Sequence, residues 1–142
     1  MKTAAIRFHD ISVGHTVTGH ESKCAHLHGH NYRIHFKLEV DELDLIGRVL
    51  DFSIIKEKLC QWLEEVWDHK FLINANDPRF QALYALDQYG VVATSFNPTA
   101  ENMAQYLLEV IGPSQLQGTG ARLTWVKVEE TFKCSAEASV DR

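Results

Sequence analysis

The sequence lacks the features that mark membrane-spanning, exported or nucleic-acid-binding proteins. No apolar run approaches the roughly 18 residues that a membrane-spanning helix needs. Residues 1–7 lack the apolar core of a secretion signal. Lysine and arginine form no runs, and the formal net charge is -5 with neutral histidines. We therefore expect no membrane association and no nucleic-acid partner.

Cysteine is also scarce, with only three in 142 residues. Three cysteines are too few for a disulfide framework, and we therefore interpret each of them as a thiol. Free thiols are typical of a reducing compartment, and we expect a cytoplasmic location. The sequence contains no repeat, no low-complexity segment and no obvious linker. Its length suits one domain, and we expect a single domain over residues 1–142.

Histidine, in contrast, is concentrated in one stretch: five of the eight histidines lie between His15 and His30. His28 and His30 flank Gly29 where a strand is expected to begin. Residues i and i+2 of a strand point to the same side, so both imidazoles can bind one ion. A catalytic zinc keeps three protein ligands and one open position. The sequence thus predicts a zinc site, with a third ligand among His15, His26, His20 and Cys24; two surface histidines at a polar strand end are the alternative.

The clearest strand is predicted over residues 30–40, where apolar and polar residues alternate. We expect further strands at residues 6–13, 48–50 and 121–132, the last rich in β-branched and aromatic residues. Together these segments indicate an antiparallel, four-stranded sheet.

Two helices are predicted by apolar residues at helical spacing. The first begins near residues 51–53, capped by Asp51 or Ser53, and ends near residue 66. The second runs from Thr99 to about residue 111 and is ended by Gly112-Pro113. Residues 74–97 form either a long loop or a loop with a short helix at 79–86. We therefore expect an α+β fold with two helices packed on one face of the sheet.

Several other polar residues are candidates for chemistry. Cys24 lies four residues before His28, and a nearby cation would favour its thiolate; a small buried hydrophobic residue is the alternative. Asp68 can orient the ring of His69 for proton transfer, although a solvated pair at a helix end is the simpler interpretation. Glu129 and Glu130 point to opposite faces of a strand, so at most one of them lies in a given pocket.

Taken together, these motifs resemble the 6-pyruvoyl-tetrahydropterin synthase superfamily. The Cys-x-x-x-His-Gly-His spacing is similar to that of its bacterial 6-carboxy-5,6,7,8-tetrahydropterin synthase branch. The matching elements follow one another along nearly the whole chain: Cys24 to His30, Asp51-Phe52, Asp68-His69, residues 97–101 and Glu130-Thr131.

The resemblance implies the tunnelling fold, with an active site between subunits of a homohexamer built as a dimer of trimers. It implies that His15 joins His28 and His30 as a zinc ligand, because residues 11–15 stand in place of the ligand-bearing strand. It also implies that Cys24 is the proton-abstracting thiolate and that Asp68 and His69 are its relay. Glu130 would anchor the pterin ring, with help from Thr99.

The implied reaction converts 7,8-dihydroneopterin triphosphate to 6-carboxytetrahydropterin, acetaldehyde and triphosphate, on the route to queuosine. One alternative is a 6-pyruvoyl-tetrahydropterin synthase, which eliminates triphosphate without cleaving the carbon chain. Another is a non-catalytic zinc or pterin-binding protein of the same fold. A purely structural zinc module is disfavoured, because such sites usually close with four protein ligands.

Overall fold

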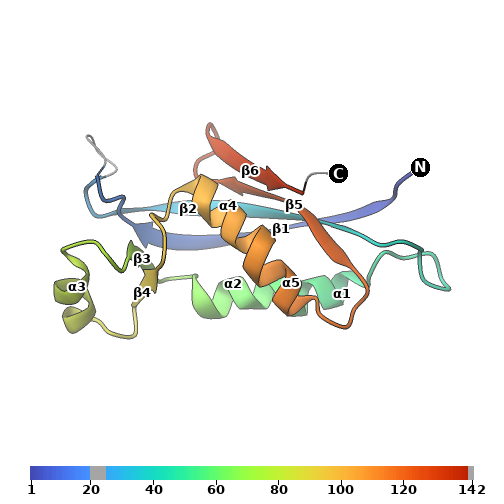
Figure 1. Cartoon of the computed structure of the whole chain (residues 1–142), viewed down its shortest axis with the longest axis horizontal. Helices are drawn as coiled ribbons and strands as arrows, with labels where there is room; N and C mark the ends of the chain where they lie inside the picture. The colour runs from blue at the N-terminus through green and yellow to red at the C-terminus, as the bar shows by residue number, and fades with distance from the viewer. Residues whose placement is uncertain (20–24, 141–142) are drawn as a thin grey trace.

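A six-stranded, curled sheet forms the centre of the protein. The computed structural model describes residues 1–19 and 25–140, and its strand order is β4-β3-β1-β2-β5-β6 (Figure 1). The strands are β1 (Ala4–His15), β2 (His28–Glu39), β3 (Phe71–Asn74), β4 (Val91–Thr94), β5 (Arg122–Glu129) and β6 (Ser135–Ser139).

The long antiparallel pair of β1 and β2 is the core of this sheet. Its ladder runs without interruption from Ala4 opposite Glu39 to His15 opposite His28. Along β2, the side chains of Tyr32, Ile34, Phe36 and Leu38 are at most 1% exposed, whereas Arg33 and its neighbours on the other face are not buried. The predicted alternation is therefore confirmed, and the strand begins two residues earlier than expected.

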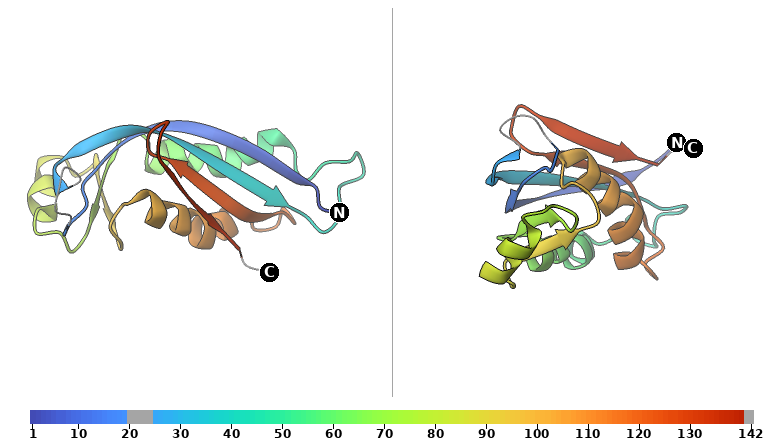
Figure 2. Two further views of the ribbon diagram at one scale, coloured as in Figure 1. Left: turned by 90° about the horizontal axis from the view of Figure 1, so that it is seen from above. Right: turned by 60° about the vertical axis from the view of Figure 1, so that its left-hand side comes forward.

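Two long helical segments cover the face of the sheet to which Tyr32 points (Figure 2). Each is continuous but contains a π-helical stretch. The first consists of α1 (Phe52–Ile55), η2 (Lys56–Cys60) and α2 (Gln61–Val66); the second consists of α4 (Ala100–Tyr106), η3 (Leu107–Ile111) and α5 (Gly112–Gln115). The expected arrangement of two helices on one face is confirmed.

The start of each segment is set by a side-chain cap. Asp51 Oδ1 accepts the Ser53 N–H at 2.8 Å, and Thr99 Oγ1 accepts the Asn102 N–H at 3.1 Å. Such caps satisfy N–H groups that the first helical turn cannot pair internally. Both segments then bury apolar side chains against the sheet, including Leu59, Leu63, Met103 and Leu107, each at most 1% exposed.

The expectation of four antiparallel strands is wrong in strand number and partly in direction. The strands β3 and β4 lie parallel to their neighbours, and they are joined by the short helix α3 (Phe80–Leu86). They are only four residues long, which is too short for a clear periodic signal. The last strand, β6, pairs with β5, but its small and polar residues carry no apolar alternation.

Three predicted boundaries are corrected as well. Residues 48–50 form no strand, because the Asp44 carboxylate accepts the N–H groups of Ile46 and Arg48 and closes a turn. The strand expected over 121–132 ends at Glu129, since Glu130 enters the turn to β6. The second helix continues through Gly112, where a Cβ atom would lie only 2.5 Å from Leu123 Cδ2. That glycine permits close packing and does not stop the helix.

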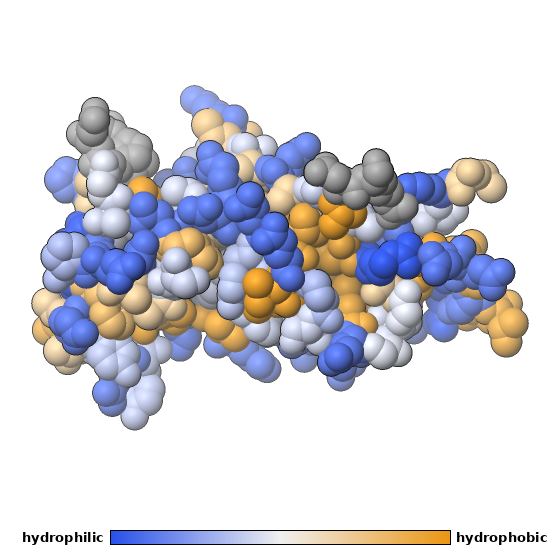
Figure 3. Space-filling model, in the orientation of Figure 1, coloured by the Kyte–Doolittle hydropathy of each residue, from blue (hydrophilic) through white to orange (hydrophobic). Residues whose placement is uncertain are grey.

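The surface is largely polar with apolar patches between the charged side chains (Figure 3). Leu45 and Ile46, in the loop before the first helix, are 105% and 74% exposed. Within residues 1–19 and 25–140, none of the helices combines the length and the apolar character that crossing a membrane requires.

Replacing Leu63 with alanine should lower the free energy of unfolding by roughly 2–5 kcal/mol, because the cavity left beneath the first helix cannot fully collapse. Leu63 is 0% exposed, whereas Leu45 is 105% exposed, so Leu45→Ala is the matched control. Urea denaturation measures both. Equal effects of the two substitutions would contradict this packing.

Candidate metal centre and active site

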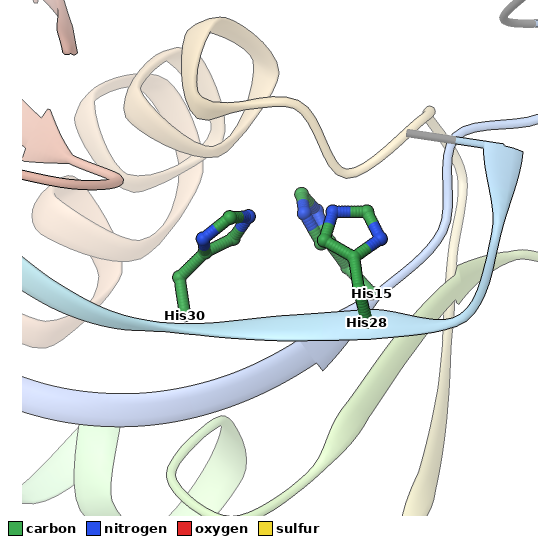
Figure 4. A group of neighbouring side chains, drawn as sticks. All are labelled: His15, His28 and His30. Atoms are coloured by element: carbon green, nitrogen blue, oxygen red, sulfur yellow. The ribbon is translucent and has the colours of Figure 1, made fainter. Parts of the chain in front are cut away.

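Three histidines meet at the end of the central ladder. His15 is the last residue of β1, and it pairs across the ladder with His28, the first residue of β2. His30 follows two residues later and therefore lies on the same face. One ring nitrogen from each histidine lies within 4.8 Å of the others, and the three rings rise together from the sheet (Figure 4). The structure thus brings together the three histidines proposed from the sequence.

Hydrogen bonds orient two of these rings. The Nδ1 atom of His15 lies 2.6 Å from the carbonyl oxygen of Pro98, and that of His28 lies 2.7 Å from the carbonyl oxygen of His26. A carbonyl can only accept, so Nδ1 carries the proton and Nε2 keeps its lone pair. Bound metal sites commonly use this arrangement, in which the second ring nitrogen donates to a backbone carbonyl.

The third ring has a buried nitrogen that lacks a hydrogen-bond partner. Among the described residues, His30 Nε2 is buried and makes no hydrogen bond. An unsatisfied buried nitrogen normally costs free energy, and a metal ion is one group that satisfies it. Burial also lowers the pKa of His15 and of His30 below their usual value, which favours the neutral imidazole that binds metal. The three residues therefore could hold a metal ion.

A carboxylate borders the histidines. Glu130 Oε1 lies 3.6 Å from Nε2 of both His15 and His30. Glu129, in contrast, pairs with His35 on the opposite face of the sheet. Only one of the two adjacent glutamates therefore faces the histidines, as expected, although Glu130 lies in the turn after β5 and not on the strand. The carboxylate of Glu130 can accept N–H groups from a ligand bound beside the three rings.

Tyr32 also belongs to this site, although the sequence indicates it only as a member of the alternating strand predicted over residues 30–40. It is 1% exposed, and its hydroxyl lies 3.3 Å from Nδ1 and 3.4 Å from Nε2 of His15. Its ring packs edge-on against the rings of His15 and His30. The signal was its position two residues after His30, on the same face of the strand.

Asp68 Oδ2 lies 3.1 Å from His69 Nδ1, so the two residues form the contact that was one of the two interpretations of this pair. The pair is fastened to β1, since Asp68 Oδ1 accepts the Ser12 N–H and the His69 N–H donates to the Ser12 oxygen. Burial opposes ionisation of Asp68, but the Ser12 N–H and the His69 ring outweigh it, so the pKa of Asp68 lies below its usual value.

This pair lies apart from the three histidines within one chain. It borders a cavity of about 640 Å³ that is also lined by Ser12 and Arg33. Those side chains point to the face of the sheet opposite to that of His15 and His30. His69 itself is 81% exposed. The structure therefore does not bring Asp68 and His69 to the histidine cluster of the same copy.

The remaining predicted site residues have mixed outcomes. Thr99 caps α4 immediately after Pro98, whose carbonyl oxygen binds His15. His26 contributes its carbonyl oxygen, and its ring is not part of the cluster. Cys24 and His20 lie outside the described residues.

Comparisons with known proteins match this chain over nearly its full length. Residues 5–140 match the family described as 6-pyruvoyl tetrahydropterin synthase. A 6-carboxy-5,6,7,8-tetrahydropterin synthase of Rickettsia felis is 31% identical over 129 residues, which are 90% of this chain and 94% of the relative. One from Rickettsia bellii is 32% identical over the same shares.

Solved structures agree in fold. An uncharacterized protein from Wolinella succinogenes has a TM-score of 0.87 at 27% identity and covers 99% of both chains. The 6-pyruvoyl tetrahydropterin synthase of Caenorhabditis elegans has a TM-score of 0.71 at 24% identity, covering 99% of this chain and 97% of its own. At that identity, the second likeness concerns the fold alone.

Replacing His15, His28 or His30 singly with alanine should remove stoichiometric divalent metal, because each imidazole supplies one of three protein ligands. Elemental analysis of the purified variants measures this. His35→Ala is the matched control, since His35 lies on β2 but pairs with Glu129 on the other face. Metal retained by His15→Ala would exclude His15 as a ligand and return the choice to the nearby His26.

The metal-free protein should lose stability in mild acid. The pKa of His15 and of His30 lies below 6.5 in the folded chain, so the unfolded chain binds more protons below that pH. The contribution of these two rings to the free energy of unfolding should be complete above pH 6.5. It should be lost progressively as the pH falls from there toward the lowered pKa values that the rings have in the folded chain. Urea denaturation with a chelator measures it.

The double variant His15→Gln/His30→Gln should show a flatter dependence of the unfolding free energy on pH than the wild-type protein. An unchanged slope in the double variant would contradict the assignment of this dependence to the two buried rings.

Proposed function

Because this chain belongs to the 6-pyruvoyl tetrahydropterin synthase family, we propose that it acts as a 6-carboxy-5,6,7,8-tetrahydropterin synthase. The resemblance drawn from the motifs is confirmed by the family match over residues 5–140 and by curated relatives of that name at 31% and 32% identity. The proposed reaction converts 7,8-dihydroneopterin triphosphate to 6-carboxytetrahydropterin, acetaldehyde and triphosphate.

The observation that carries the proposal is the meeting of three metal-competent imidazoles with the Glu130 carboxylate at one end of the ladder. We propose zinc as the metal, because three neutral histidines with one open position are typical of catalytic zinc. When bound, zinc would supply Lewis-acid polarisation of the hydroxyl groups on the substrate side chain. His15, His28 and His30 hold it.

Glu130 and Thr99 position the pterin ring in this proposal. The two oxygens of Glu130 accept N–H groups from the amidine-like edge of the ring. The Thr99 oxygen accepts the Asn102 N–H, so its own O–H can donate to the substrate. The Glu130 carboxylate lies beside the histidines, and Thr99 directly follows Pro98, whose carbonyl oxygen contacts His15.

Cys24, Asp68 and His69 move the protons. The Cys24 thiolate abstracts a proton from the substrate side chain, and the Asp68–His69 pair relays it. The lowered pKa of Asp68 keeps its carboxylate ionised beside the His69 ring. This negative charge stabilises the ring while it carries the relayed proton.

The placement of this pair supports a site shared between copies. Asp68 and His69 border the face of the sheet opposite to the histidine cluster, so a second copy must bring its own pair to that cluster. We therefore propose a homohexamer, a dimer of trimers, as the functional form. The cytoplasmic location and the role in queuosine synthesis stay predictions.

Incubation of the zinc-loaded protein with 7,8-dihydroneopterin triphosphate should release acetaldehyde and triphosphate in equal amounts, with the product identified by mass spectrometry. Triphosphate without acetaldehyde would indicate the 6-pyruvoyl activity instead. Binding of zinc and pterin without formation of any product would indicate a non-catalytic binding protein.

Cys24→Ala is the internal control of that experiment: it should keep its zinc and lose turnover by about 100-fold or more, the range of positioned proton transfer. Cys134→Ala, at an exposed thiol, should retain wild-type activity. Full activity of Cys24→Ala would remove this thiol from the mechanism.

A further inference from the structure

Tyr32 is a buried residue that contacts the histidine cluster and has no part in the proposed reaction. It follows His30 by two residues on β2, so both side chains project from the same face of the strand. The centre of its ring lies 6.0 Å from that of His15 and 5.6 Å from that of His30, and it meets both rings edge-on. Tyr32 is only 1% exposed, so these contacts are internal to the fold.

The hydroxyl of Tyr32 lies against the face of the His15 ring. Its oxygen is almost equally far from the two ring nitrogens, 3.3 Å from Nδ1 and 3.4 Å from Nε2, and the planes of the two rings are nearly perpendicular, at 87°. An oxygen in the plane of the imidazole at these two distances would collide with Cε1, which lies between the nitrogens. The hydroxyl therefore does not occupy the lone pair of Nε2, because that lone pair points outward in the ring plane.

Tyr32 and Pro98 restrain the His15 ring in two different directions. The torsion that rotates a histidine ring about its bond to Cβ has broad minima, so a ring without restraints takes many orientations. The carbonyl oxygen of Pro98, at 2.6 Å from Nδ1, limits this rotation at one edge of the ring. The Tyr32 hydroxyl limits tilting at the face. The two contacts together fix the ring and leave Nε2 available to a metal ion.

We propose that Tyr32 is a positioning residue that holds the rings of His15 and His30 in their metal-binding arrangement before an ion is bound. The hydroxyl supports His15, and the edge of the aromatic ring supports His30. This role rests on the proposed function, because it requires a metal ion at the three histidines. A site whose ligands are already oriented loses less conformational freedom on binding, and it therefore binds more tightly.

Tyr32→Phe removes the hydroxyl and keeps the ring, and it should weaken zinc binding about 10-fold, within the range typical of groups that orient metal-binding histidines. Tyr32→Leu also removes the ring edge, and it should weaken binding by about 100-fold. Competition with a chromophoric chelator measures the dissociation constants. Tyr106→Phe is the matched control, because the half-buried ring of Tyr106 stacks on Trp67 instead. It should bind zinc with wild-type affinity.

The absorption bands of the cobalt-substituted protein separate positioning from packing. A residue that only fills the core would change the free energy of unfolding and leave the metal site as it is. The bands depend on the arrangement of ligands around the ion. At saturating cobalt, Tyr32→Phe should therefore shift them relative to the wild-type protein, and Tyr106→Phe should not.

Wild-type zinc affinity in Tyr32→Phe would overturn the role of the hydroxyl, and so would cobalt bands identical to those of the wild-type protein. If Tyr32→Leu fails to fold, Tyr32→Phe decides alone, since it conserves the shape of the ring. If the wild-type protein binds zinc and forms no product, the proposed reaction fails, and the zinc affinities still decide the role of Tyr32.

If the wild-type protein binds no stoichiometric metal, the proposed metal site fails, and a double-mutant cycle of Tyr32→Phe and His15→Ala decides whether the hydroxyl holds the ring. Urea denaturation with a chelator measures the cycle. Residues in contact show non-additive effects on the free energy of unfolding, so additive effects would overturn the role of Tyr32. A smaller effect of Tyr32→Phe in the His15→Ala background would support it.

Discussion

The antiparallel ladder between β1 and β2 is the constraint on which the site depends. It sets His15 directly opposite His28 and places His30 on the same face two residues later. Side chains alternate along a strand, so a slip of one residue would turn both β2 histidines to the opposite face. The register is secured by the same alternation that buries Tyr32, Ile34 and Phe36 against the helices. The metal-competent cluster is therefore an extension of the hydrophobic core pattern to the end of the sheet.

The helical segment that begins at α4 orients one of the histidines that the ladder brings together. The cap of α4 at Thr99 follows Pro98, whose carbonyl oxygen binds Nδ1 of His15 and directs Nε2 into the cluster. The same packing removes water from the rings, which lowers the pKa of His15 and His30 and keeps them neutral. Burial that would be unfavourable for a charged histidine thus suits a metal ligand.

The two faces of the sheet carry different polar groups. The helix-covered face holds the histidines, with Glu130 beside them. The other face carries a layer of ion pairs and a cavity that Asp68 and His69 border from the Ser12 backbone. In that layer, Arg33 binds Asp10 through two bonds and lies 4.1 Å from the ring centre of Phe8. This division explains why a single copy does not assemble every residue of the proposed mechanism.

Local pattern was sufficient for much of this protein. The alternation over residues 30–40, the caps at Asp51 and Thr99, and the spacing of His28 and His30 are short-range features, so the sequence by itself determined the central strand, both helices and two of the three candidate ligands. The resemblance to the family added His15, which meets His28 only across the ladder. Tertiary structure decided the rest. The short strands β3 and β4 gain their pairing only from neighbours distant in the sequence. Arg79 meets Thr16 and Ala25 across more than 50 residues, and Asp68 meets Ser12 in the same way. No spacing along the chain encodes such contacts, because they exist only once the sheet and helices have packed.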